Sequence, residues 1–442
     1  MEKLHKLSCD CSKSEIDLFS IPPTQTTIEQ GKWVEFFPVT SIADATPIQF
    51  HLQSSPEEYT DLSQTLLHLK AKVVNADGTA LTDESSVAPV NLFLHSLFSE
   101  VDVMFNDTLI TPSTNTHPYR AMFENLLTYG RDAKLSQLTS SLFYKDTAGY
   151  MEINDPLASS NTNEGLNKRH EFTKLSKTVD MVGRLHVDAS FQDRLIMGGV
   201  DIKFKLHRSK NAFSLMSSTP EASYKVKITE ASLLVRRVKL SPTTSLLHAK
   251  TLETETAKYP IRRVVTTSFS IPKGQLSFTR ESLVIGQIPK RMVIGCVSNT
   301  AYNGSYARNP FNFHHYDLNY IALYANSEQV PWKPLRPQFT GSSPNYILAY
   351  QTLFSGTNSM FHDKGNHITR DDYGKGYAIY AFDLTPDLST DDYFQPKTSG
   401  SVRLEWTFAS PLSETVNVVV YSEFESILEV DRNRNVTLDY GN

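Results

Sequence analysis

The chain has 442 residues, of which 40% are hydrophobic and 21% are charged, and its formal net charge is −5 at pH 7. This composition is typical of a globular protein and excludes a largely disordered chain. The length is more than one ordinary core fills and predicts two domains of about 200 residues each. A negative net charge does not support a polybasic protein that coats nucleic acid.

Targeting segments and cysteines add little to this picture. No apolar stretch follows residues 1–6, so we expect no secretory signal. No run approaches the roughly 20 apolar residues that span a bilayer, so we expect no membrane span and synthesis in the cytosol. The three cysteines, Cys9, Cys11 and Cys296, are too few to indicate a disulfide framework. Cys9 and Cys11 would supply half of a metal site, but no second Cys or His pair is placed to complete it.

The first half begins as a polar arm and continues as strands. Residues 1–30 include Pro22 and Pro23 and predict an extended N-terminal arm. The turn signal Asn106-Asp107 separates two short strands. The strands predicted here lie at 33–39, 47–52, 62–74, 101–105 and 108–110.

A helical excursion then interrupts the strands. Pro118 opens and Gly130 closes a segment with apolar residues at helical spacing, which predicts an amphipathic helix. A second short helix is expected at 132–142, and a long exposed loop at 147–174. Strands are predicted again at 179–187, 200–206 and 226–239.

The second half repeats this plan after a break at Ser241 and Pro242. A helix is predicted at 245–258, ended by Pro260, and we expect the domain junction there. Gly-, Ser- and Asn-rich loops extend through Thr369. The elements predicted in this half are strands at 264–271, 292–297 and 318–325, a helix at 346–353, and strands at 377–384, 402–408 and 416–424.

One short phrase occurs twice, about 200 residues apart. Residues 198–206 read GGVDIKFKL and residues 400–408 read GSVRLEWTF, with apolar side chains at every second position in the same register. β-rich runs follow at 224–240 and at 416–430. Two unrelated amphipathic strands would share such alternation, but the repeat favours two β domains of similar build. Few full helices alternate with the strands, so we expect antiparallel sandwiches, in the jelly-roll version, rather than a parallel α/β sheet.

No established catalytic motif is present. The chain has no phosphate-binding glycine loop, no GxSxG nucleophile elbow and no HExxH zinc helix. The best metal-like cluster is His362, His367 and Asp371, flanked by Asp363 and Asp372. This stretch is polar and contains Gly and Asn, so solvated side chains explain it equally well.

A second histidine pattern, His314-His315-Tyr316-Asp317, precedes an apolar run. His315 and Asp317 would share one face of a strand, where a structural pair is favoured over catalysis. The acidic neighbours Asp371-Asp372 and Asp391-Asp392 would point to opposite sides of an extended segment, which is poor geometry for joint acid–base work.

Basic residues form three short groups: Lys168-Arg169-His170, Arg236-Arg237 and Arg262-Arg263. Acidic residues offset each group, and none is long enough to predict a phosphate-binding patch. We therefore expect no catalytic, cofactor-binding or metal site, and a structural protein rather than an enzyme.

Eight phrases spread along the chain carry a family resemblance: residues 14–26, 36–42, 61–65, 89–98, 113–120, 143–149, 179–184 and 380–388. Together they resemble the major capsid proteins of Polinton/Maverick elements and of the related adintoviruses. The resemblance runs from about residue 14 to the C-terminus and is distributed rather than confined to one motif.

This resemblance implies an all-β, double jelly-roll, hexon-like fold: two eight-stranded antiparallel sandwiches side by side, with short helices in the loops. The arm would be 1–30, the first jelly roll 31–241 and the second 242–442. The excursions at 111–177 and 327–375 would decorate the outer side of the shell.

The resemblance also implies assembly as the function. Three chains would form a pseudo-hexagonal capsomer, and capsomers would build an icosahedral virion capsid around double-stranded DNA. The partners would be neighbouring capsomers, the penton (vertex) protein and minor capsid proteins, with at most weak non-specific contact to DNA. Synthesis would occur in the host cytoplasm and assembly in the host nucleus, without a cofactor.

Three alternatives remain open at this point. A glycoamidase-like hydrolase also has two adjacent jelly rolls, and would place its site in the stretch from His362 to Asp372. A carbohydrate-binding sandwich would use Trp332, which lies beside Pro331 and near Pro334. A penton protein usually has a single jelly roll, whereas this chain has the length and the repeat for two.

Overall fold

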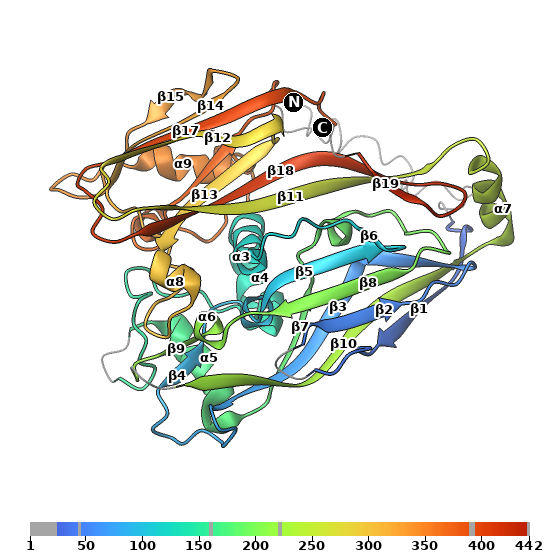
Figure 1. Ribbon diagram of the computed structural model, residues 1–442, viewed down its shortest axis with the longest axis horizontal. Helices are drawn as coiled ribbons and strands as arrows, with labels where there is room; N and C mark the ends of the chain where they lie inside the picture. The colour runs from blue at the N-terminus through green and yellow to red at the C-terminus, as the bar shows by residue number, and fades with distance from the viewer. Residues whose placement is uncertain (1–23, 43–45, 159–161, 220–222, 389–393, 440–442) are drawn as a thin grey trace, which may run out of the picture.

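The chain folds into two β-sandwiches that lie one on the other (Figure 1). The computed structural model describes residues 24–42, 46–158, 162–219, 223–388 and 394–439. All strand pairs between the named strands are antiparallel in this part of the chain. This arrangement confirms the all-β class with short helices in the loops.

The first jelly roll contains two four-stranded sheets. Sheet I has the order β1-β10-β3-β7 and sheet II the order β2-β8-β5-β6. Their strands are β1 (Ile28–Phe36), β2 (Ile48–Leu52), β3 (Glu58–Asn75), β5 (Phe98–Phe105), β6 (Thr108–Leu109), β7 (Val179–Arg184), β8 (Ile202–Arg208) and β10 (Tyr224–Leu240). A small extra pair is formed by β4 (Val87–Pro89) and β9 (Leu215–Ser217).

The second jelly roll has the same topology. Sheet III has the order β11-β18-β13-β16 and sheet IV the order β12-β17-β14-β15. Their strands are β11 (Ala257–Ile271), β12 (Ser277–Gln287), β13 (Arg291–Ser298), β14 (Leu318–Ala325), β15 (Glu328–Leu335), β16 (Ile379–Asp383), β17 (Ser399–Phe408) and β18 (Val416–Val430), with β19 (Val436–Leu438) added beside β18. When each set of eight is numbered along the chain, both rolls have one sheet in the order 1-8-3-6 and one in the order 2-7-4-5. Sheets I and III are therefore equivalent, as are sheets II and IV, and the chain is a double jelly roll.

The repeated phrase occupies equivalent strands in the two rolls. Residues 198–206 lead into and form most of β8, and residues 400–408 lie in β17, the seventh strand of each roll. The alternating apolar residues face the core, for example Phe204 and Trp406, which are both almost fully buried. The β-rich runs that follow are β10 and β18, the eighth strands. The predicted repeat is confirmed.

The four sheets stack in the order I, II, III, IV, so sheets II and III face each other between the rolls (Figure 1). Asn106, in the turn between β5 and β6, donates a hydrogen bond to the carbonyl of Arg434, whose Nε donates to the carbonyl of Gly198. The burial of the eighth strands reflects this stacking. The first nine residues of β18, 416–424, are all buried, whereas β10 begins with strict alternation of buried and exposed residues. Sheet III is thus covered on both faces and sheet I on one.

Helices occupy the connections between strands. They are α2 (Phe93–Ser96), α3 (His117–Thr128), α4 (Arg131–Leu135), α5 (Glu164–Thr173), α6 (Asn211–Ser214), α7 (Pro242–Thr251), α8 (Asn299–Asn303), α9 (Ile347–Ser355) and α10 (Arg370–Tyr373), with 3₁₀ turns η2 (Gln137–Ser141), η3 (Lys174–Ser176) and η4 (Asp188–Phe191). The helices predicted at 118–130 and 346–353 are confirmed by α3 and α9. The single helix predicted at 132–142 is instead α4 followed by the 3₁₀ turn η2, with non-helical Ser136 between them.

The predicted exposed loop at 147–174 is wrong for residues 164–173, which form α5. The side chain of Asn163 accepts a hydrogen bond from the backbone of Leu166 and caps this helix. Arg169 on α5 is fully buried, and its Nη2 lies 2.7 Å from Oδ1 of Asp146, which is also buried. At least one charged residue of this polar stretch is therefore buried and paired rather than exposed to water.

Two element boundaries differ from prediction, and two strands were not predicted. The helix expected at 245–258 ends at Thr251, and Pro260 lies inside β11, at the edge of sheet III where a missing N–H is tolerated. Strands β12 and β15 were not predicted, since β12 is mostly exposed and β15 contains two prolines. β1 begins at Ile28, so residues 28–30 of the predicted arm belong to sheet I, while residues 1–23 lie outside the described residues. The domain limits 31–241 and 242–442 stay a prediction.

Replacing Trp406 by Ala should lower the free energy of unfolding by about 3–5 kcal/mol, because the side chain is 1% exposed and would leave a cavity in the second core. Thr407, on the opposite face of β17, is the matched control, and Thr407→Ala should change stability by less than about 0.5 kcal/mol. Urea unfolding followed by circular dichroism measures both. Equal losses for the two variants would contradict the assignment of the buried face.

Candidate functional site: the seam between the two jelly rolls

Helix α3 lies in the seam between the two jelly rolls (Figure 1). It follows β6 of sheet II and packs against β5 on one side and against β11 and β18 of sheet III on the other. Pro118 near its start favours the helix. Ten of its twelve residues are buried. Its aromatic side chains pack against the second roll, with the ring centre of Phe123 5.0 Å from that of Phe313. The helix predicted to be amphipathic is therefore covered on its polar side as well.

The polar side of α3 carries two charges one helical turn apart, Arg120 and Glu124. Nη2 of Arg120 lies 2.8 Å from Oδ1 of Asp188, and its Nε lies 3.2 Å from Oε1 of Glu124. His186, in the segment after β7, donates from Nδ1 to Oε2 of Glu124 at 2.5 Å. All four residues are buried.

The second jelly roll completes this set. The hydroxyl of Tyr421 on β18 donates to Oε1 of Glu124 at 3.3 Å. Arg262 on β11 places Nη2 3.9 Å from Oε1 of Glu124, and its Nη1 lies 3.8 Å from Oε2 of Glu423. We call Arg120, Glu124, His186, Asp188 and Arg262 the seam network. It joins groups from both rolls around one carboxylate.

The pKa directions agree with this geometry. Burial by itself would raise the pKa of Glu124, but Arg120 and His186 more than offset it and hold the pKa well below its ordinary range. Burial raises the pKa of Asp188, although Arg120 and the backbone N–H of Val264 favour its charged form. Burial disfavours the charge on Arg262 as well, yet Tyr421 and Glu423 raise its pKa. The carboxylate of Glu124 is therefore ionised because both rolls supply donors to it.

Two further histidines lie against His186. The ring centre of His95, on α2, is 4.7 Å from that of His186 and 5.6 Å from that of His117. Burial, and then the neighbouring His186, lower the pKa of His117 to about 3 and that of His95 well below its ordinary value. Nδ1 of His95 and Nε2 of His117 are buried without a hydrogen-bond partner among the described residues. These two histidines are neutral in the folded protein, and protonating them would be unfavourable.

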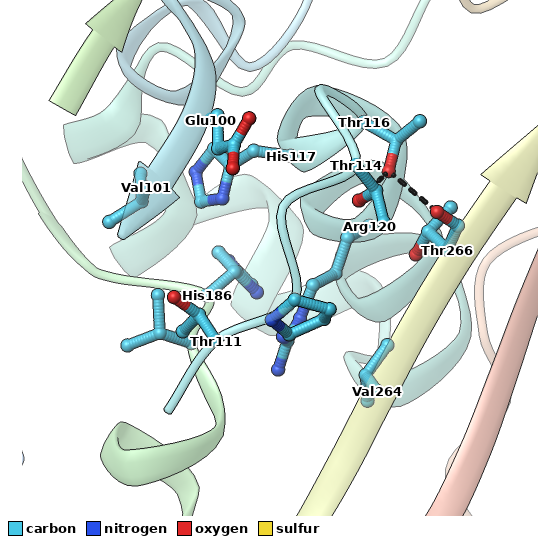
Figure 2. Close-up of a pocket in the computed structure, with 12 residues that line it drawn as sticks. Glu100, Val101, Thr111, Thr114, Thr116, His117, Arg120, His186, Val264 and Thr266 are labelled. Carbon is cyan, nitrogen blue, oxygen red and sulfur yellow. Dashed lines mark hydrogen bonds between the residues drawn. The ribbon is translucent and has the colours of Figure 1, made fainter. Parts of the chain in front are cut away.

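A cavity of about 30 Å³ adjoins the network (Figure 2). His117, Arg120 and His186 line it, together with Glu100 and Thr266. Its volume suits about one water molecule, whereas sites for small-molecule ligands span about 300–1,000 Å³. The chemistry of the seam is therefore that of a structural joint.

The cluster predicted around His362 is not assembled as a ligand set. Lys145 donates to the carbonyl of His367 and to Oδ2 of Asp372, both at 2.7 Å. Burial and Lys145 lower the pKa of His367 to about 4. Burial opposes the charged form of Asp372, but Lys145 brings its pKa below the ordinary value, and the same carboxylate caps α10. His362, Asp363 and Asp371 lie on the exposed part of this stretch. Within the described residues, no three His, Cys, Asp or Glu side chains are grouped to hold a metal ion.

His315 and Asp317 form the predicted structural pair, with Nδ1 of His315 3.4 Å from Oδ1 of Asp317, but the strand on which they were expected to share a face is wrong. Tyr316 and Asp317 have φ angles of 47° and 50°, so this segment is a turn before β14 rather than a strand. Nδ1 of His315 accepts the backbone N–H of Asp317 at 2.9 Å, and its ring stacks on Phe339 at 4.2 Å. Burial and the adjacent His314 lower the pKa of His315 to about 3.

The basic groups bind partners within the chain. Nη1 of Arg236 lies 2.9 Å from Oδ2 of Asp61, and Nη2 of Arg237 donates to the carbonyl of Gln53. Arg263 stacks on Phe424 at 4.3 Å. Arg169 and Arg262 are the internal charges described above. These arginines therefore do not form a surface for phosphate groups.

The remaining candidates are placed as follows. Cys296 is buried on β13, and burial raises the pKa of its thiol. Trp332 is 89% exposed on β15. Cys9, Cys11, Asp391 and Asp392 lie outside the described residues. None of the helices in the described ranges is long and apolar enough to cross a bilayer.

Sequence reasoning missed the seam network. The spacing of Arg120 and Glu124, four residues apart on the predicted helix, was the available signal. It is also the spacing of an ordinary surface ion pair. Only the position of the second roll over this face of α3 distinguishes the two cases.

Glu124→Gln should lower the free energy of unfolding by about 3–5 kcal/mol, since it leaves Arg120 and Arg262 without their shared carboxylate. Glu171, whose partner Lys174 lies on an exposed helix end, provides the control. Glu171→Gln should cost at most about 1 kcal/mol. Thermal unfolding of the two variants measures the difference, and similar losses would argue against a charged seam.

The free energy of unfolding should fall as the pH is lowered from 6.5 to 5. An unfolded histidine binds a proton below a pKa of about 6.5, whereas folded His117 does so only near 3, so acid favours the unfolded state. At pH 5 the protonation of unfolded His117 lowers the free energy of unfolding by about 2 kcal/mol. His95 acts in the same direction. Glu124 adds to the loss only below its unfolded pKa, near pH 4.5. Urea unfolding at pH 7 and pH 5 should show a smaller fall for His117→Gln than for the unchanged chain. Equal falls would contradict the role of His117.

No protein-family model matches the chain. The uncharacterized protein F54H12.2 of Caenorhabditis elegans is 26% identical over 435 residues, covering 95% of this chain and 99% of that protein.

Solved structures of viral proteins share the fold at low sequence identity. A chain of the Sputnik virophage superposes with a TM-score of 0.65 at 12% identity and covers 97% of this chain and 92% of its own length. The Faustovirus major capsid protein has a TM-score of 0.56 at 11% identity, with 95% and 93% covered. The mavirus major capsid protein has a TM-score of 0.55 at 13% identity, with 97% and 94% covered. The chain therefore has the double jelly-roll fold that viral major capsid proteins adopt.

Proposed function

We propose that the chain is a structural major capsid protein, three copies of which close into a pseudo-hexagonal capsomer of an icosahedral shell around double-stranded DNA. The observation that carries this proposal is the stacking of the four sheets. Sheets II and III face each other inside the chain, so within the described residues sheets I and IV have no facing sheet at the two ends of the stack.

The two end sheets, I and IV, have the same strand orders as the two inner sheets. Sheet IV has the topology of sheet II, and sheet I that of sheet III. A contact between sheet IV of one copy and sheet I of the next would repeat the internal contact. Such head-to-tail contacts close into a ring when the rotation per step is suitable, and a step of roughly 60° per sandwich closes after three chains.

The resemblance in eight phrases supports a Polinton/Maverick or adintovirus origin, and the nearly full-length relative in Caenorhabditis elegans fits an element carried by animals. The partners in this proposal are neighbouring capsomers, a penton protein and minor capsid proteins, with at most weak contact to DNA. The location is the virion capsid, assembled in the host nucleus.

No enzymatic activity is part of the proposal. The histidines and acidic residues that suggested chemistry either hold internal structure or lie on exposed loops, as Lys145 between His367 and Asp372 illustrates. The jelly rolls would correspond to residues 31–241 and 242–442, and the arm to 1–30.

The solution mass tests this proposal directly. Light scattering of the purified chain should give the mass of three 49.8 kDa chains, and negative-stain images of the same peak should show a hexagonal outline. Permanent interfaces of this kind commonly bury more than about 2,000 Å², so the trimer should persist on dilution to micromolar concentration. A monomer under these conditions would overturn the proposal.

A further inference from the structure

The second jelly roll carries an apolar groove of about 950 Å³ at its open edge. The groove lies where β15, the edge strand of sheet IV, and β16, the edge strand of sheet III, are bridged by α9. Its main apolar lining residues are Ile288, Val330, Trp332, Phe354, Phe361 and Leu388.

Several of the apolar side chains that line the groove are largely exposed to solvent. Trp332 and Phe361 are each 89% exposed and Leu388 is 68% exposed. Burying such side chains removes apolar surface from water, so a complementary apolar segment would be favoured here. Exposed apolar patches of this kind mark interaction surfaces in soluble proteins.

We propose that this groove binds residues 16–21 of a second copy of the chain. This segment reads IDLFSI and has four apolar side chains, Ile16, Leu18, Phe19 and Ile21. Pro22 and Pro23 follow it and favour an extended backbone. The segment belongs to the 23 residues that precede the described chain, and it is the most apolar part of them.

The groove opens at the end of the second roll that corresponds to the end of the first roll where β1 begins, and the segment is joined to β1. Its lining includes Ile288, Asn326 and Leu384, which directly follow β12, β14 and β16. In antiparallel rolls of this topology, strands 2, 4 and 6 end where strand 1 begins. The start of β1, to which the segment is joined, therefore lies at the corresponding end of the first roll.

Nearness favours a second copy over the same copy. β1 belongs to sheet I, and the groove lies beyond sheet III, so at least two intersheet spacings, about 20 Å, separate them within one chain. Phe19 is nine residues before Ile28, the start of β1, and extends at most about 30 Å from it, so binding within one chain is the alternative that the experiment below must exclude. In the ring proposed above, sheet I of the next copy lies against sheet IV, which brings the neighbour's segment to the groove. The inference rests on that proposed function.

Prolines on β15 determine the kind of contact. Pro331 and Pro334 lack the N–H groups that an added strand would need at this edge. The segment is therefore recognised by its apolar side chains in the groove rather than by extending sheet IV.

The test is photo-crosslinking in the full chain with p-benzoyl-phenylalanine in place of Phe19. Irradiation should give adducts with the mass of two chains, and mass spectrometry should locate the crosslink at 328–332, 352–362 or 384–388. The double variant Trp332→Ser, Phe361→Ser should reduce the yield at least about tenfold. Leu246→Ser on α7 removes an apolar side chain of similar exposure, 72%, away from the groove, and should leave the yield unchanged.

Three outcomes would overturn the inference: an adduct within one chain, an adduct outside the groove or on another protein, and no adduct. Light scattering of the same samples separates this failure from that of the proposed function. Trimers without the groove adduct would reject the arm contact alone, whereas monomers would reject both.

Discussion

The two jelly rolls share one buried carboxylate, that of Glu124. Arg120 and His186 from the first roll and Arg262 and Tyr421 from the second all approach it. A buried charge is tolerated when several donors surround it, and here no single roll provides all of them. Separating the rolls would expose the apolar outer face of sheet III and also leave this carboxylate without half of its donors. The order of the four sheets depends on this joint.

The seam also explains why the two rolls differ in sequence despite their shared topology. Sheet III is covered on both faces, and the first nine residues of β18 are all buried. Its equivalent, sheet I, has one uncovered face, on which Lys225 and Lys227 are exposed on β10. A permanent internal contact can be apolar, whereas a surface that waits for another copy must stay soluble before association. In the proposed ring, the contact between copies is therefore expected to be more polar than the internal contact between sheets II and III.

Much of the fold could be predicted from alternation alone. In β8 and β17 every second residue is buried, and the phrases containing Phe204 and Trp406 predicted equivalent strands. β12 could not be found this way, because most of it is exposed, nor could β15, because of its prolines. α5 was missed because a buried Arg169 has the same sequence signature as an exposed one. The seam network was hidden for the same reason: Arg120 and Glu124 follow a surface pattern, and only the long-range position of β11 and β18 buries them.

The prolines of β15 have a consequence for how copies of the chain meet. An edge strand with free N–H and C=O groups is a template on which another chain can add a strand, and such additions link copies into open-ended aggregates. Pro331 and Pro334 have no N–H to donate, so β15, the edge strand of sheet IV, lacks a continuous row of donors. In the proposed ring, copies would therefore associate through the faces of their sheets rather than through this edge, and packed side chains on those faces would set the angle between neighbours.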